Sequence, residues 1–327
     1  MQAPPPKMAH LNEPVLQRGS DMKTAFRILA AYAMTLLAGG GPLAAHAAGQ
    51  PAPATGAAQQ ALAVEVFNPG EAAIFAVSSV LVQGKHDAIL IDAQFSADQA
   101  RKLAGRIKAS GKRLTTIYVS HGDPDYYFGL DTLRQAFPAA RILATPQTIA
   151  HIQATKDEKL KVWGPKLGEN APRQLIVPDA LQGDTLTLEG QTLRIIGLDG
   201  PAPDRSVVWI PSIRTVAGGI PVMAGEHVWI ADTQTPASRQ HWLAMLDRIK
   251  ALQPETVIPG HFLGAMPTGL AAVDFTRAYL RAFDEEAAKA GNAAELIAAL
   301  KRRYPDLGGE TSLALSAKVI KGEMQWK

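Results

Sequence analysis

The chain has 327 residues, enough for one large domain or two small ones, and its 47% hydrophobic and 19% charged residues are ordinary for a globular protein with a full core. The formal net charge is +3, and the sequence has no stripe of Lys and Arg and no aromatic residues interleaved with them, so we expect no nucleic-acid partner. The absence of cysteine excludes a disulfide framework and a thiolate nucleophile or ligand.

The first 47 residues have the pattern of an upstream extension followed by a secretory signal peptide. A short basic start at residues 22–27 precedes an apolar stretch at 28–37, which is too short to span a bilayer comfortably. Small residues at 45–47 then resemble a cleavage site. The pattern predicts a periplasmic or secreted protein without stable membrane insertion after cleavage; a retained anchor is the alternative. Translation could start at Met1 or at Met22.

Residues 48–60 form a low-complexity segment, which we expect to be a flexible linker. The folded part begins near residue 61, and its first half alternates strand and helix patterns. The expected elements there are strands at 63–67, 73–82, 88–91, 115–119 and 141–144, and helices at 96–110, 127–136 and from Pro146 onward. The polar stretch at 156–172 predicts an excursion or flap rather than core.

The second half repeats the order of strands and then helices. Strands are expected at 174–177, 185–188, 191–197, 206–210, 215–217, 227–230 and 256–258, with a helix at 236–252 before the last of them. Residues 269–321 have a helical pattern. Two strand-rich halves, each followed by helices, predict two sheets packed face to face with helices outside.

The loop at 120–129 carries the most distinctive chemistry. His121, Asp123 and Asp125 stand at i, i+2 and i+4 after a buried strand, so that one imidazole and two carboxylates can converge on one point. Such donors suit a divalent metal. Without further motifs, the loop could equally be a polar turn that caps a helix starting near Tyr126.

Three pieces of the chain resemble the metallo-β-lactamase fold superfamily. The loop at 121–129 resembles the marker His-x-His-x-Asp-His-x-x-Gly, Asp92 resembles the strand-end Asp that supports the site, and Pro259-Gly260-His261 resembles the last ligand motif. The resemblance implies an α+β fold, a four-layer αββα sandwich over residues 61–265, with residues 266–327 as a C-terminal helical extension packed on the domain. It also implies a metal-dependent hydrolase.

The chain departs from that pattern at four places. Asp123 and Tyr126 stand where the marker has its second and third His, and Gly218-Gly219 lacks the bridging carboxylate. The segment at 197–206 lacks the His of the third motif. A subset of the superfamily that is associated with hydrolytic dehalogenation of chlorothalonil resembles the altered loop more closely.

The remaining residues imply a single-metal site. Two imidazoles and one carboxylate, from His121, Asp123 and His261, would hold about one zinc per chain and leave a position for water. Asp125 is the expected catalytic base, or a ligand to a weaker second metal. Supporting residues or additional ligands are expected among Asp92, Asp204, His227 and Asp232; Asp199 is a further carboxylate near the missing His.

Several other residues have two interpretations. Tyr126 is expected to pack rather than bind metal, and His151 to lie on the surface. Trp163, Trp209 and Trp229 could line a pocket for an apolar or aromatic substrate or could simply fill the core.

The predicted function is hydrolysis of a small-molecule ester, amide, lactone or carbon–halogen bond by a metal-activated water. The alternative is a non-catalytic periplasmic binding or scaffold protein with a degraded metal site, since four ligand positions are changed or missing. A redox member that uses iron is a third, weaker hypothesis, because the bridging carboxylate is absent. The expected partner is a small-molecule substrate, and a homodimer is possible.

Overall fold

The computed structural model describes residues 60–326. The predicted signal peptide and almost all of the predicted linker lie outside the described residues. Within these residues no helix is both long and apolar enough to cross a membrane.

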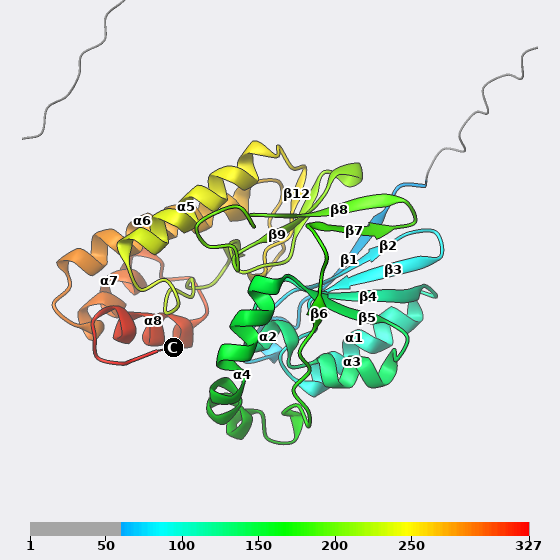
Figure 1. The fold of residues 1–327 in the computed structure, drawn as a ribbon. Helices are drawn as coiled ribbons and strands as arrows, with labels where there is room; N and C mark the ends of the chain where they lie inside the picture. The colour runs from blue at the N-terminus through cyan, green and yellow to red at the C-terminus, as the bar shows by residue number, and fades with distance from the viewer. Residues whose placement is uncertain (1–59, 327) are drawn as a thin grey trace, which may run out of the picture. The chain divides into compact units, whose positions relative to one another are not determined.

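Two mixed β-sheets form the centre of the described region (Figure 1). The first sheet has the strand order β1-β2-β3-β4-β5-β6, with β1 (Ala63–Phe67), β2 (Ser79–Gln83), β3 (Asp87–Ile91), β4 (Arg113–Val119), β5 (Arg141–Ala144) and β6 (Asp179–Ala180). The second has the order β12-β10-β9-β8-β7, with β7 (Thr185–Leu188), β8 (Gln191–Ile196), β9 (Val207–Ile210), β10 (Thr215–Ala217) and β12 (Thr256–Val257). A short parallel pair, β11 (Met223–Ala224) and β13 (His261–Phe262), completes the strands.

Alternation along the strands separates two hydrophobic clusters. Val80 and Ile91 pack into a cluster that the two sheets share, whereas Leu81 and Leu90 pack into the larger cluster on the helical side. Successive side chains of a strand point to opposite faces, so strands that are apolar throughout require both faces to be covered. The two-sheet architecture with outer helices that the sequence predicts is confirmed.

The helices follow the predicted order, and residues 60–326 also contain three short 3₁₀ segments. They are α1 (Ala97–Ala109), α2 (Pro124–Tyr127), α3 (Leu130–Ala136), α4 (Pro146–Leu167), α5 (Pro236–Ala251), α6 (Ala271–Lys289), α7 (Ala293–Arg303) and α8 (Glu310–Ile320). In Figure 1, α1 and α3 lie together beside the first sheet, and α5 runs along α6. The C-terminal helices share the larger hydrophobic cluster with the sheets.

The helix α4 corrects the expectation of a flap at 156–172, because it continues to Leu167. The Thr145 side chain caps it by accepting a hydrogen bond from the backbone N–H of Thr148, and a proline occupies its first turn. Its polar residues form an exposed face, while a few widely spaced residues such as Trp163 are buried. A sparse buried stripe of this kind gives little periodic signal.

Other boundaries differ for local reasons. The predicted helix at 127–136 is split, because Gly129 donates its N–H to the carbonyl of Gln94 and a Cβ at Gly129 would lie 2.0 Å from the Ala93 oxygen. No strand forms at 227–230, where the backbone N–H of His227 instead bonds to Gly308. The predicted strand at 73–82 begins only at residue 79, and the one at 174–177 is replaced by β6.

The connection after β10 is tightly packed at Gly219. A Cβ at Gly219, whose φ is +74°, would lie 2.1 Å from the Ser206 carbonyl oxygen, whereas Gly264, with φ +78°, has open space. We expect Gly219→Ala to lower the free energy of unfolding by about 3 kcal/mol and Gly264→Ala by only about 1 kcal/mol. Urea denaturation measures both, and equal losses would contradict the packing.

His227 gives a pH-dependent prediction. It is buried in the core, its Nδ1 lies 2.8 Å from the Tyr279 hydroxyl, and burial lowers its pKa from 6.5 to about 4. The unfolded chain therefore takes up a proton before the folded chain does, so stability is lost as the pH falls from 6.5 towards 4. At pH 5 we expect a loss of about 2 kcal/mol relative to about pH 8 that His227→Gln does not show. Urea denaturation of both proteins at the two pH values measures the difference, and parallel losses would refute it.

Candidate active site

The polar residues singled out in the sequence lie at the ends of neighbouring strands. β3 and β4 are parallel neighbours, so Asp92, which follows β3, and the loop at 120–125, which follows β4, meet at one edge of the sheet. His261 begins β13, and Val77, beside β2, forms an isolated bridge with it. Strand pairing thus brings three distant segments together.

Asp92 holds the loop at 120–125 in place and does not itself line a pocket. Its carboxylate accepts hydrogen bonds from the Ser120 N–H (2.8 Å) and hydroxyl (2.6 Å), and Ser120 Oγ in turn accepts one from the Gly219 N–H (2.6 Å). Burial raises the pKa of Asp92 to about 7, and the Ser120 hydrogen bonds act in the opposite direction. This chain of bonds ties β3, the loop and the connection after β10 to one another.

Asp123 stands between an imidazole and an ammonium group. His121 Nε2 lies 3.2 Å from its Oδ2, and the Lys159 ammonium donates to its Oδ1. Burial opposes the charge of Asp123, but Lys159 and His121 outweigh it and hold its pKa well below the usual range. His121 Nδ1 donates to the backbone carbonyl of Asp204 (3.1 Å).

Asp125 belongs to a second ionic group. Its Oδ2 lies 2.8 Å from His261 Nε2, and the other ring nitrogen of His261 lies 3.6 Å from Glu226 Oε1. Burial lowers the pKa of His261, yet Asp125 and Glu226 more than compensate, so that the pKa is raised. Burial raises the pKa of Glu226 to about 7. The imidazole therefore lies between two carboxyl groups and is held by Asp125.

The two ionic groups do not share a metal position. The ring of Tyr126 packs between the two imidazoles, its centroid 5.2 Å from that of His121 and 5.6 Å from that of His261. Within residues 60–326, no group of three or more His, Asp or Glu residues could hold a metal ion. A catalytic zinc uses three protein ligands directed at one point; in the first group Lys159 contacts Asp123, and in the second the His261 imidazole lies between Asp125 and Glu226. The residues of this site do not fit a zinc ion.

Packing and charged partners occupy the places where the bridging carboxylate and the third-motif His are missing. A Cβ at Gly218 would lie 2.8 Å from Ile91 Cγ2, so the place of the bridging carboxylate has no room for a side chain. Asp199 forms an ion pair with Arg248 (2.7 Å), and the Asp204 carboxylate lies 3.9 Å from His151 Nδ1. These two carboxylates therefore have partners other than the imidazoles of the predicted metal site.

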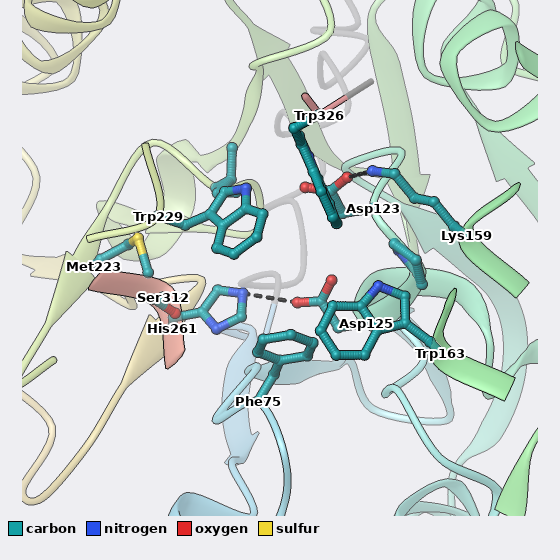
Figure 2. Close-up of a pocket in the computed structure, with 12 residues that line it drawn as sticks. Phe75, Asp123, Asp125, Lys159, Trp163, Met223, Trp229, His261, Ser312 and Trp326 are labelled. Atoms are coloured by element: carbon teal, nitrogen blue, oxygen red, sulfur yellow. Dashed lines mark hydrogen bonds and ion pairs between the residues drawn. The ribbon is translucent and has the colours of Figure 1, made fainter. Parts of the chain in front are cut away.

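A pocket with an empty volume of about 430 Å³, including its open part, lies over both ionic groups. Its polar lining includes Asp123, Asp125, Lys159 and His261. Its apolar lining is mainly aromatic and comes from Phe75, Trp163, Trp229, Trp326, Met223 and Ile220. Figure 2 shows the aromatic rings arranged around the Asp125 carboxylate, with the Asp123–Lys159 pair at one side. Such a lining suits a small, mainly apolar ligand.

The other candidate residues are divided between pocket and core. The Asp232 carboxylate accepts hydrogen bonds from the indole N–H groups of Trp229 and Trp326, so it positions two walls of the pocket. Trp209 belongs to the hydrophobic core and His227 contacts Tyr279, so neither lines the pocket.

His151 lies in the site, although the sequence favours a surface position for it. Its side chain is 26% exposed, and its Nε2 lies 3.8 Å from Asp123 Oδ1. A Cβ at Gly122 would lie 2.6 Å from the His151 ring, so this glycine allows α4 to approach the loop.

Sequence reasoning missed several side chains of the site, some that line the pocket and one, Glu226, that lies beside His261. Lys159, four residues before Trp163, lies on the same face of α4 and reaches the same pocket. That spacing is a usable signal, but only once the segment is known to be a helix rather than a flap. Phe75, Glu226 and Trp326 carry no local motif, and only the fold brings them together.

Comparison with known proteins agrees with this architecture. Residues 73–261 match the family model described as the metallo-beta-lactamase superfamily. No curated protein matches the chain. A metallo-beta-lactamase family protein from Thermus thermophilus has 17% identity and a TM-score of 0.57, over 79% of this chain and 91% of that one. A beta-lactamase domain protein from Burkholderia ambifaria has 18% identity and a TM-score of 0.57, over 79% and 84%.

At such identities the solved structures establish the fold alone. The family match covers more than half of the chain and spans Asp92, the loop and His261. The chain therefore belongs to the metallo-β-lactamase superfamily, whose members are generally metal-dependent hydrolases that usually bind zinc.

Proposed function

We propose that this chain is a hydrolase for a small, mainly apolar molecule and that Asp125 is its general base. The observation that carries the proposal is the 2.8 Å contact between Asp125 Oδ2 and His261 Nε2 beneath an aromatic pocket. The contact fixes one carboxylate oxygen, while the carboxylate as a whole lines the pocket. A fixed carboxylate next to a substrate pocket can orient and deprotonate water.

The reaction follows from these groups. As the water oxygen bonds to the electrophilic carbon of an ester, amide or lactone, its proton passes to Asp125; the bond to the leaving group then breaks, and that group takes the proton. The His261 imidazole between Asp125 and Glu226 holds the base in place. Lys159 supplies a positive charge on the pocket wall, which would stabilise the negative charge that develops on the substrate oxygen. A carbon–halogen bond remains within the proposed substrate range.

A binding protein is the second candidate, and a specific observation favours it. Asp123 is paired with the Lys159 ammonium group and Asp125 with the His261 imidazole, so both carboxylates on the floor of the pocket already have a partner. Such a pocket could hold an apolar molecule without chemistry.

Export of the protein remains part of the proposal and rests on the signal-peptide pattern alone.

The test is hydrolysis of a panel of aryl esters, anilides and aromatic lactones, followed in parallel with quenching of tryptophan fluorescence. We expect turnover that Asp125→Asn lowers at least about 100-fold, because the amide cannot accept the proton. The matched control is Asp157→Asn, an exposed residue that pairs with Lys156, and it should leave turnover unchanged.

The outcomes separate the two candidates. If compounds quench the tryptophan fluorescence but none of them is hydrolysed, the pocket is assigned to binding. If turnover persists in Asp125→Asn, Asp125 is not the general base. If no compound quenches the fluorescence and none is hydrolysed, both functions are excluded for this class of compound.

A further inference from the structure

We infer that Lys159 takes the position of the metal cation in this site and that the folded protein is metal-independent. Lys159 is 4% exposed, and its ammonium group contacts Asp123 Oδ1 directly. Asp123 stands at a position where the superfamily marker has a ligand His, so the contact lies within the expected metal site. The inference holds whether or not the pocket is catalytic.

The electrostatics of the site require a cation at this point. Asp123 and Asp125 are both buried and lie two positions apart in the loop, and Asp232 also contributes negative potential at Lys159. Buried carboxylates that lie close together need a proton or a cation between or beside them. The Lys159 ammonium meets this need from within the chain.

The position of Lys159 is built into the fold. It projects from α4 together with His151 and Trp163, which lie eight residues before it and four residues after it, and both of these also face the site. The glycine at 122 leaves room for α4 to lie against the loop. A zinc ion bound to Asp123 would have to displace the ammonium group from its carboxylate partner.

The changed ligands fit the same interpretation. Tyr126 fills the space between the imidazoles, and the glycines at 218 and 219 leave no room for a bridging carboxylate. Each change removes a metal ligand, and Lys159 supplies a charge that the lost metal would have supplied. A site that had merely decayed would be expected to leave Asp123 uncompensated.

The first measurement is the metal content of the purified full-length chain, after incubation with excess zinc and then desalting. We expect well below one zinc per chain and a Tm that neither zinc nor EDTA changes. Zinc retained at about one per chain, with a Tm that falls on chelation, would overturn the inference.

The second measurement is a double-mutant cycle on the ion pair. Lys159→Met leaves Asp123 buried without its cation, and we expect Tm to fall by roughly 10 °C. Lys159→Met combined with Asp123→Asn should recover most of that loss, because neither charge remains. Lys161→Met is the matched control: this lysine is exposed on the same helix and pairs with Glu158, so Tm should not change.

Lys159→Arg keeps the cation and guards against a variant that fails to fold. A Tm near that of the wild type in Lys159→Arg, with a low Tm or no folding in Lys159→Met, supports the role of the charge. Equal Tm values for Lys159→Met and the wild type would refute it. Zinc-free protein without turnover would refute the hydrolase but leave this inference standing. Active protein that retains zinc would refute this inference but leave the hydrolase standing.

Discussion

Burial of negative charge at one edge of the first sheet is the constraint on which the site depends. Asp92, Asp123, Asp125 and Glu226 are all nearly inaccessible to solvent. A buried carboxylate is costly unless it is hydrogen-bonded, paired or protonated. The structure meets the cost at Asp92 by hydrogen bonds from Ser120, at Asp123 by Lys159 and at Asp125 by His261. At Glu226, burial instead raises the pKa to about 7.

These separate solutions explain why the loop keeps its shape. In a metal site, one cation compensates several ligands at once and fixes their mutual geometry. Here the compensation is divided between an ammonium group on α4 and an imidazole on β13, and the Tyr126 ring lies between the two imidazoles. Each partner comes from a different segment, so the tertiary fold itself maintains the charge balance of the pocket.

The sequence predicts the sheets well and the site only in part. Strands such as those at 63–67 and 141–144 are short apolar runs between turn signals, and local pattern is sufficient for them. Motif spacing locates Asp92, the loop and His261. The failure at α4 has a physical reason: most of this helix faces solvent, and its buried residues are too sparse to give a period. A polar stretch that is taken for a flap gives no reason to place Lys159 beside Asp123.

The ligand positions illustrate the limit of motif comparison. A motif identifies which residues stand at the expected places, but not which side chain from elsewhere replaces the missing partner. Asp123 in place of a histidine is ambiguous by itself, because an oxygen donor can bind a metal or accept an ion pair. The contact with Lys159 removes the ambiguity, since an ammonium group and a metal ion compete for the same carboxylate. The partner lies 36 residues further along the chain, on α4. The chemistry of the loop is therefore decided by α4, and a change in that helix is sufficient to alter the site without any change in the loop.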